Sequence, residues 1–229
     1  MAEATRDQIL AAATRLMAAH GVAGTSIQDV ADAVSLRKAS VLYHFPSKDA
    51  LRKAVIDALL TRWRDVLPQL LLSGDMGPEA RLDAVMGEFI TFFSADADRA
   101  RLLVRELLDR PAEMEPYLVE TIGPWLRVIA LALDAGKSRG LVRVDADLRT
   151  LPILLGTLVL SSIAAWDSLG FLAREPAAKA VSPGTTRHHI ELMRIARAAL
   201  FPDASPSTEA SPDLTSDVSP RGAPNVRPT

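Results

Sequence analysis

The amino-acid sequence predicts an all-α protein, and three observations support this prediction. Apolar residues recur at intervals of three and four along most of the 229-residue chain, which is the spacing of one helix face. No stretch alternates apolar and polar residues convincingly, as a half-buried strand would. Glycine, proline and Ser/Thr capping signals separate the apolar stretches at lengths that are typical of helices.

The N-terminal third of the chain predicts three short helices followed by a long one. The first helix shows a core-facing stripe at Ile9, Ala13 and Met17 and ends at Gly21. Ser47 follows Pro46 and offers an N-cap for the long helix. The predicted spans are Thr5–His20, a second helix capped by Thr25 or Ser26, Arg37–His44, and Lys48–Leu72.

The remainder of the chain predicts a bundle of longer helices and then a tail. The predicted helices are Pro78–Ser94, Asp98–Asp109, Pro116–Gly140, Leu148–Ala173 and Thr185–Phe201. The last 28 residues, Pro202–Thr229, contain six prolines, five serines and no aromatic residue. Such a composition buries too little apolar surface to fold, so we expect a disordered tail there.

Composition excludes several kinds of site. The chain has no cysteine, which excludes disulfides, zinc sites built on thiolates and a cysteine nucleophile. The net charge is −2, but residues 1–53 hold seven basic against five acidic residues, whereas the rest holds 19 against 23. This mild asymmetry permits a nucleic-acid-binding face at the N-terminus.

One stretch is apolar enough to be compared with a membrane span. Residues Thr150–Trp166 carry no charge over 17 positions, the lower limit for a spanning helix, but they include Pro152, Gly156 and Ser161. The start of the chain carries charges where a signal peptide needs an apolar run. We therefore expect a buried helix, no membrane partner and a cytoplasmic protein.

The segment Ser26–Lys53 combines two short helices, a tight turn and a third helix, an architecture that presents one helix to the major groove of DNA. Within it, Val34–Leu51 (VSLRKASVLYHFPSKDAL) closely resembles the TetR/AcrR family of regulators. The resemblance covers roughly residues 5–55, and it departs from the family pattern at two places. Ser35 stands where the family has a turn glycine, and Leu42 stands where it has an aromatic residue. The matching positions are Val30-Ala31, Ser40, Tyr43-His44-Phe45, Ser47-Lys48 and Asp49.

This resemblance implies a specific organisation and function. Residues 1–53 would form a three-helix helix-turn-helix DNA-binding domain, and residues 54–201 a C-terminal helical bundle for effector binding and dimerisation. The protein would be a ligand-responsive transcriptional regulator, by default a repressor, that binds palindromic operator DNA as a homodimer. A helical protein-interaction module without DNA binding is the alternative.

The expected DNA contacts follow from residue chemistry on the motif. Arg37 and Lys38 stand at the entry of the third helix, where cations meet phosphates or guanine edges. Tyr43 can contact a thymine methyl group or a phosphate. The remaining candidates can donate to phosphates, and Lys48 also adjoins the start of the fourth helix. The full set is Thr25, Ser26, Arg37, Lys38, Ser40, Tyr43, His44 and Lys48.

The C-terminal part predicts an effector pocket and a self-association surface. Aromatic residues on several helices can line an apolar pocket, and the candidates are Phe89, Phe93, Trp125 and Trp166. We expect a small apolar effector there, with Trp63 distant from it. For the dimer surface, small residues at 157–165 permit close helix approach, and an apolar stripe at 190–200 completes it.

The sequence does not favour an enzyme. His188 and His189 are adjacent, so on a helix their rings diverge and cannot share a metal as i, i+4 residues can. Arg101, Arg105 and Glu106 fit exposed surface pairs. No nucleotide-binding or metalloprotease motif occurs. We therefore expect no catalytic residues, no metal and no cofactor.

Overall fold

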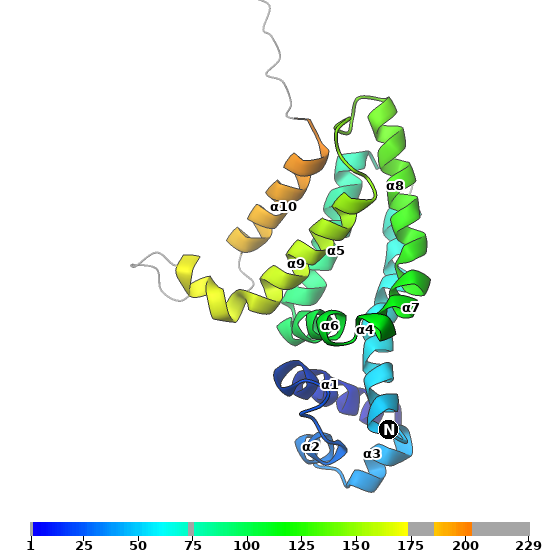
Figure 1. Ribbon diagram of the computed structural model, residues 1–229, viewed down its shortest axis with the longest axis vertical. Helices are drawn as coiled ribbons and strands as arrows, with labels where there is room; N and C mark the ends of the chain where they lie inside the picture. The colour runs from blue at the N-terminus through cyan, green and yellow to red at the C-terminus, as the bar shows by residue number, and fades with distance from the viewer. Residues whose placement is uncertain (1, 73–75, 174–185, 203–229) are drawn as a thin grey trace, which may run out of the picture.

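A computed structural model describes residues 2–72, 76–173 and 186–202, and these residues form helices with no strand among them. The all-α prediction is confirmed. Figure 1 shows the arrangement. The helices are α1 (Ala2–His20), α2 (Ile27–Ala33), α3 (Lys38–His44), α4 (Lys48–Leu72), α5 (Pro78–Ser94), α6 (Ala97–Asp109), α7 (Pro111–Thr121), α8 (Gly123–Ser138), α9 (Thr150–Leu169), a 3-10 turn η1 (Gly170–Ala173) and α10 (Thr186–Leu200).

Helices α1 to α3 form a unit at one end of the molecule, and the long helix α4 begins there and continues into the upper bundle (Figure 1). The predicted stripe of α1 is buried: Ile9, Ala13 and Met17 are each fully covered. They belong to the same core as Val41 and Phe45 at the end of α3. The boundary expected after residue 53 therefore falls inside a continuous helix.

Helix α6 lies between the N-terminal unit and the upper bundle (Figure 1), where it packs against α1 on one side and α9 on the other. Arg105 of α6 donates to the carbonyl of Ala19 at the end of α1. Helices α5, α8, α9 and α10 form the upper bundle with the second half of α4, and α7 packs against α4, α6 and α8. Because α6 contacts both parts, it connects the N-terminal unit to the upper bundle.

A buried ion-pair network joins α4 to α6 and α7. The Arg52 side chain is only 2% exposed, and its Nε donates to Glu106 at 2.6 Å while its Nη1 donates to Glu113 at 2.5 Å. Glu106 is itself buried. The expectation that Glu106 forms an exposed pair was therefore wrong. Its partner lies 54 residues away and is brought close only by the packing of α4 on α6.

Two helices replace one in the segment predicted as Pro116–Gly140. The first, α7, begins with Pro111 in its first turn, and α8 begins again at Gly123 with Pro124 in its first turn. A proline in the first turn loses no helical hydrogen bond, which explains why both prolines mark starts. Pro116 lies inside α7 instead of opening a helix. The predicted disordered tail lies, apart from Pro202, outside the described residues.

Helix α9 with η1 is the one described segment long and apolar enough to cross a membrane, over Thr150–Leu172. A single helix of this kind is weak evidence for a span. Here it packs against α5, α6 and α10. Several of its apolar side chains, Ile153, Leu154 and Leu169, remain exposed.

Candidate nucleic-acid interface and apolar cavity

The start of α2 is fixed by a reciprocal capping box. The Ser26 hydroxyl accepts a hydrogen bond from the Asp29 backbone N–H at 3.1 Å, and the Asp29 carboxylate accepts from the Ser26 N–H at 2.7 Å. The backbone and side-chain hydrogen bonds from Ser26 hold the pKa of Asp29 below its ordinary value. Of the two predicted caps, Ser26 is therefore the one that the structure uses.

The turn between α2 and α3 depends on Ser35 in a left-handed conformation, with φ of 55°. The Ser35 N–H donates to Asp32 O and the Leu36 N–H donates to Ala31 O, which is the hydrogen-bond pattern of a Schellman helix end. This position favours glycine, so serine adopts it at a conformational cost. The turn directs the chain into α3.

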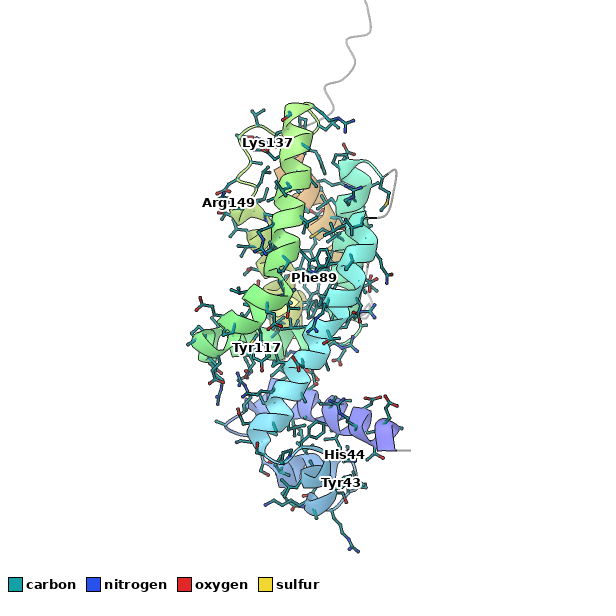
Figure 2. All side chains as sticks on the ribbon, turned by 90° about the vertical axis from the view of Figure 1, so that its right-hand side faces the viewer. Tyr43, His44, Phe89, Tyr117, Lys137 and Arg149 are labelled. Carbon is teal, nitrogen blue, oxygen red and sulfur yellow. The ribbon has the colours of Figure 1, made fainter. Side chains whose placement is uncertain are left out.

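Helix α3 has one face in the core and the opposite face in solvent. Val41 and Phe45, one turn apart, are buried, and Leu42 packs against the same core. At 100° per residue, Ala39 and Tyr43 lie on the opposite face. The Tyr43 side chain is 86% exposed, and Figure 2 shows it at the end of the molecule that lies away from the bundle. An aromatic ring so exposed on a helix held by its other face is available to a partner.

The basic residues predicted at the entry of α3 are exposed. Arg37 is the N-cap residue and Lys38 the first helical residue, and both side chains are in solvent. Ser40 and His44 are half-buried on the flank of α3, and the His44 ring contacts the Tyr43 ring edge-on at 5.4 Å. Ala39 was not among the predicted contacts, although its i, i+4 spacing from Tyr43 is visible in the sequence.

Two predicted DNA-contacting residues have structural partners inside the protein. Thr25 is 2% exposed and its hydroxyl donates to Gly21 O at 2.9 Å, so this burial conflicts with a phosphate contact. Lys48 donates from Nζ to the carbonyls of Val22 at 2.9 Å and Ala23 at 3.3 Å. An ammonium has three donors, so Lys48 keeps one for a phosphate. It also ties the start of α4 to the loop before α2.

An apolar cavity of about 550 Å³ lies within the upper bundle. Its walls come from helices α4 to α10, and almost all of the side chains are aliphatic or aromatic. Phe89 and Phe93 line it as predicted, and Figure 2 shows Phe89 inside the bundle. Among the described residues, the lining includes neither Trp125 nor Trp166. Polar groups in the lining belong to Arg81, Thr157 and Trp63.

Trp63 lines this cavity, contrary to the expectation that it would lie far from the pocket. Its ring contacts Phe89 at 4.9 Å, Phe92 at 5.5 Å and Phe93 at 6.2 Å between centroids. A sequence signal for this position exists, because Leu60, Trp63, Leu67 and Leu71 recur at helical spacing along α4 and all line the cavity.

Trp166 lies against α10 instead of in the cavity. Its ring stacks on His188 with centroids 4.2 Å apart and planes 20° apart. Burial, and next the neighbouring His189, hold the pKa of His188 below its ordinary value of 6.5. The His189 ring bonds with the Ser94 hydroxyl at 2.9 Å. The described residues contain no cluster of three metal-ligating side chains.

Comparisons with known proteins point to one family. Residues 9–55 match the bacterial regulatory proteins of the tetR family. Over 82 residues the chain is 35% identical to an HTH-type transcriptional regulator of Lactococcus lactis, a match covering 36% of this chain and 42% of that protein. Over 147 residues it is 25% identical to the HTH-type transcriptional repressor KstR2 of Rhodococcus jostii, covering 62% of this chain and 70% of that one.

Solved structures share the fold along most of the chain. The ketosteroid transcriptional regulator KstR2 of Mycobacterium tuberculosis superposes with a TM-score of 0.67 over 87% of this chain and 96% of that one, at 15% identity. The match to the Lactococcus protein spans about two fifths of that protein's length. The capped α2, the tight turn and the half-exposed α3 define a helix-turn-helix protein. In this N-terminal domain, over residues 9–55, the chain is similar to the tetR family of bacterial regulatory proteins.

Proposed function

We propose that this protein is a ligand-responsive transcriptional regulator, by default a repressor, that acts in the cytoplasm and binds palindromic operator DNA as a homodimer. The observation that carries the proposal is α3. Its inner face is anchored by buried Val41 and Phe45, while Arg37, Lys38 and the ring of Tyr43 are presented to solvent at one end of the molecule. A rigid helix with cations at its start and an exposed aromatic ring fits the major groove.

Each exposed residue of this unit has a role in the proposed complex. Ala39 and Tyr43, on the outer face of α3, would contact base edges, and the small side chain of Ala39 lets the helix come close. Arg37 and Lys38 would contact phosphates or guanine edges, and Ser26 and Lys48 would bond phosphates from outside the groove. Ser40 and His44 flank the base-contacting face.

A second copy of the chain would pack against α9 and α10. Leu154, Leu158 and Ser161 follow one exposed face of α9, and Ile190 and Ile195 are exposed on α10. A contiguous apolar patch in solvent is a feature of protein–protein interaction sites. Two-fold pairing here would present two copies of α3 to the two half-sites of a palindrome.

The cavity would hold the effector, and its lining suggests how binding reaches α3. Helix α4 contributes Leu60 and Trp63 to the cavity, and the same helix carries Arg52, which is bonded to Glu106 of α6 and Glu113 of α7. A ligand that fits the cavity only when α4 and α6 shift would change the distance between the two copies of α3 in the dimer. It must prefer that arrangement in order to release DNA.

Selection of bound sequences from a random duplex pool tests this proposal. A palindromic consensus with two half-sites about one helical turn apart supports a dimeric regulator. The affinity of the protein for the selected duplex should fall steeply as the salt concentration rises. At a fixed salt concentration, Lys38→Ala should bind this duplex more weakly than the unaltered protein does. Arg139→Ala is the matched control, because Arg139 is an exposed cation at the end of α8. Enrichment of no sequence, or equal losses for both variants, contradicts the proposal and favours a protein-interaction module.

A further inference from the structure

The beginning of α1 lies beside the end of α3, on the part of the molecule that carries the exposed face of α3 (Figure 1). The Cζ atom of Arg6, in the second turn of α1, lies 5.4 Å from the centroid of the Phe45 ring. Phe45 is the C-cap residue of α3 and is only 3% exposed, whereas Arg6 is exposed. Because a cation is attracted to the face of an aromatic ring, this contact holds the Arg6 guanidinium next to the end of α3.

Arg6 belongs to a unit whose cations have no acidic partner. Within the described residues of α1, α2 and α3 no ion pair forms, and the first pair along the chain lies in α4. The acidic residues of α2 bond neutral groups instead. Asp29 accepts from the Ser26 N–H and Asp32 accepts from the Gln28 amide, each at 2.7 Å. The positive charge of Arg6 is therefore left for a partner outside the chain.

We propose that Arg6 contacts a backbone phosphate at the edge of the groove that receives α3, so that the DNA-binding surface extends onto α1. This inference rests on the proposed binding of operator DNA. A guanidinium carries five N–H donors in a fork that matches a phosphate, and the Phe45 contact restrains this fork beside the end of α3. A phosphate contact carries no sequence information, so Arg6 adds affinity and helps to position the unit on the duplex.

The salt dependence of duplex binding tests this contact, on a selected palindrome and on a random duplex of equal length. Arg6→Met keeps an apolar side chain over Phe45 and removes the charge. We expect both duplexes to bind about ten-fold more weakly, and the slope of log affinity against log salt to decrease in size by about 0.9. Arg6→Lys keeps the charge and should keep the slope. Arg15→Met is the matched control, because Arg15 is exposed on the same helix but lies about 180° around it from Arg6.

A change of opposite sign comes from Glu3, which is exposed three residues before Arg6. At 100° per residue Glu3 lies within about 60° of Arg6 around α1, so its carboxylate repels a phosphate held by Arg6. Glu3→Gln removes this repulsion and should strengthen binding to both duplexes about two-fold at low salt, whether or not Arg6→Met folds. Asp7→Asn is its control, because Asp7 lies about 100° around the helix from Arg6 and should change affinity less.

Failure of this contact and failure of the regulator can be told apart. If the unaltered protein binds no duplex, the proposed function and the contact are both refuted. If it binds with steep salt dependence while Arg6→Met keeps the same slope, the contact alone is refuted and Arg6 only covers Phe45. The contact is also overturned if Arg15→Met loses as much slope as Arg6→Met, if Arg6→Met changes base preference, or if Glu3→Gln leaves affinity unchanged.

Discussion

Replacing Glu106 by glutamine tests whether the network around Arg52 holds the N-terminal unit to the bundle. The substitution keeps the shape of the side chain and removes its negative charge. Arg52 remains buried at 2% exposure, with Glu113 at 2.5 Å and Asp49 at 3.7 Å as its remaining acidic partners. Both of those carboxylates are substantially exposed, so they compensate the guanidinium less well than buried Glu106 does.

The expected loss of stability follows from the burial of the pair. Removing one partner of a buried ion pair costs about 3–5 kcal/mol, because the other charge stays buried without compensation. Since Glu113 and Asp49 remain, we expect the lower end, about 3 kcal/mol. For a protein of this size the corresponding fall in Tm is about 6–12 °C.

Urea unfolding followed by circular dichroism measures this loss. Glu88→Gln is the matched control, because it removes the partly exposed pair between Glu88 and Arg62 and should cost under about 1 kcal/mol. Adding Arg52→Met to Glu106→Gln removes the stranded charge and should recover part of the stability. If Glu106→Gln were as stable as Glu88→Gln, the network would not be a buried ion pair in solution.

Four further predictions follow from single features. Tyr43→Ala should change base preference by about 1–3 kcal/mol at the contacted position, measured by competition between duplexes, whereas Arg139→Ala should leave preference unchanged. Ser26→Ala removes the cap of α2 and should lower the free energy of unfolding by about 1 kcal/mol in urea; no change would mean that the cap is dispensable. Burial keeps His188 neutral in the folded protein, so the unfolded chain binds a proton first and stability should fall as pH drops below about 6.5. His188→Gln should lessen that fall, as seen in melting curves from pH 7.5 to 5.5. Leu158→Glu should shift sedimentation toward a monomer, and an unchanged profile would place the dimer surface elsewhere.

Local signals in the sequence were sufficient to place most helices. The predicted spans Lys48–Leu72 and Pro78–Ser94 agree with α4 and α5, because Ser47 and Pro78 mark their starts through chemistry within one turn. The single helix predicted at 116–140 failed for a local reason as well. The predicted helix runs through Gly123-Pro124, whereas the chain ends α7 just before this pair and begins α8 there.

Residues that meet across the fold were harder to predict. The outer face of α3 follows from spacing along seven residues, so the exposed Arg37, Lys38 and Tyr43 were predicted, although Ala39 was missed and Ser40 and His44 are half-buried. The partners of Arg52 and Trp63 lie on other helices, and nothing near them in sequence identifies those partners. The sequence therefore predicts an exposed Glu106 and a Trp63 distant from the pocket. Both residues are instead buried where α4 meets its neighbours.

Helix α4 is continuous from Lys48 to Leu72, so its helical register fixes the rotation of the N-terminal unit relative to the upper bundle. The N-terminal unit and the cavity are joined without a flexible linker, so they cannot be exchanged between relatives simply by cutting near residue 53. Inserting a single residue between Arg52 and Trp63 would rotate one half against the other by about 100°. Exchange of these modules therefore requires junctions that preserve the register of α4, and insertions of a whole number of turns would be tolerated best.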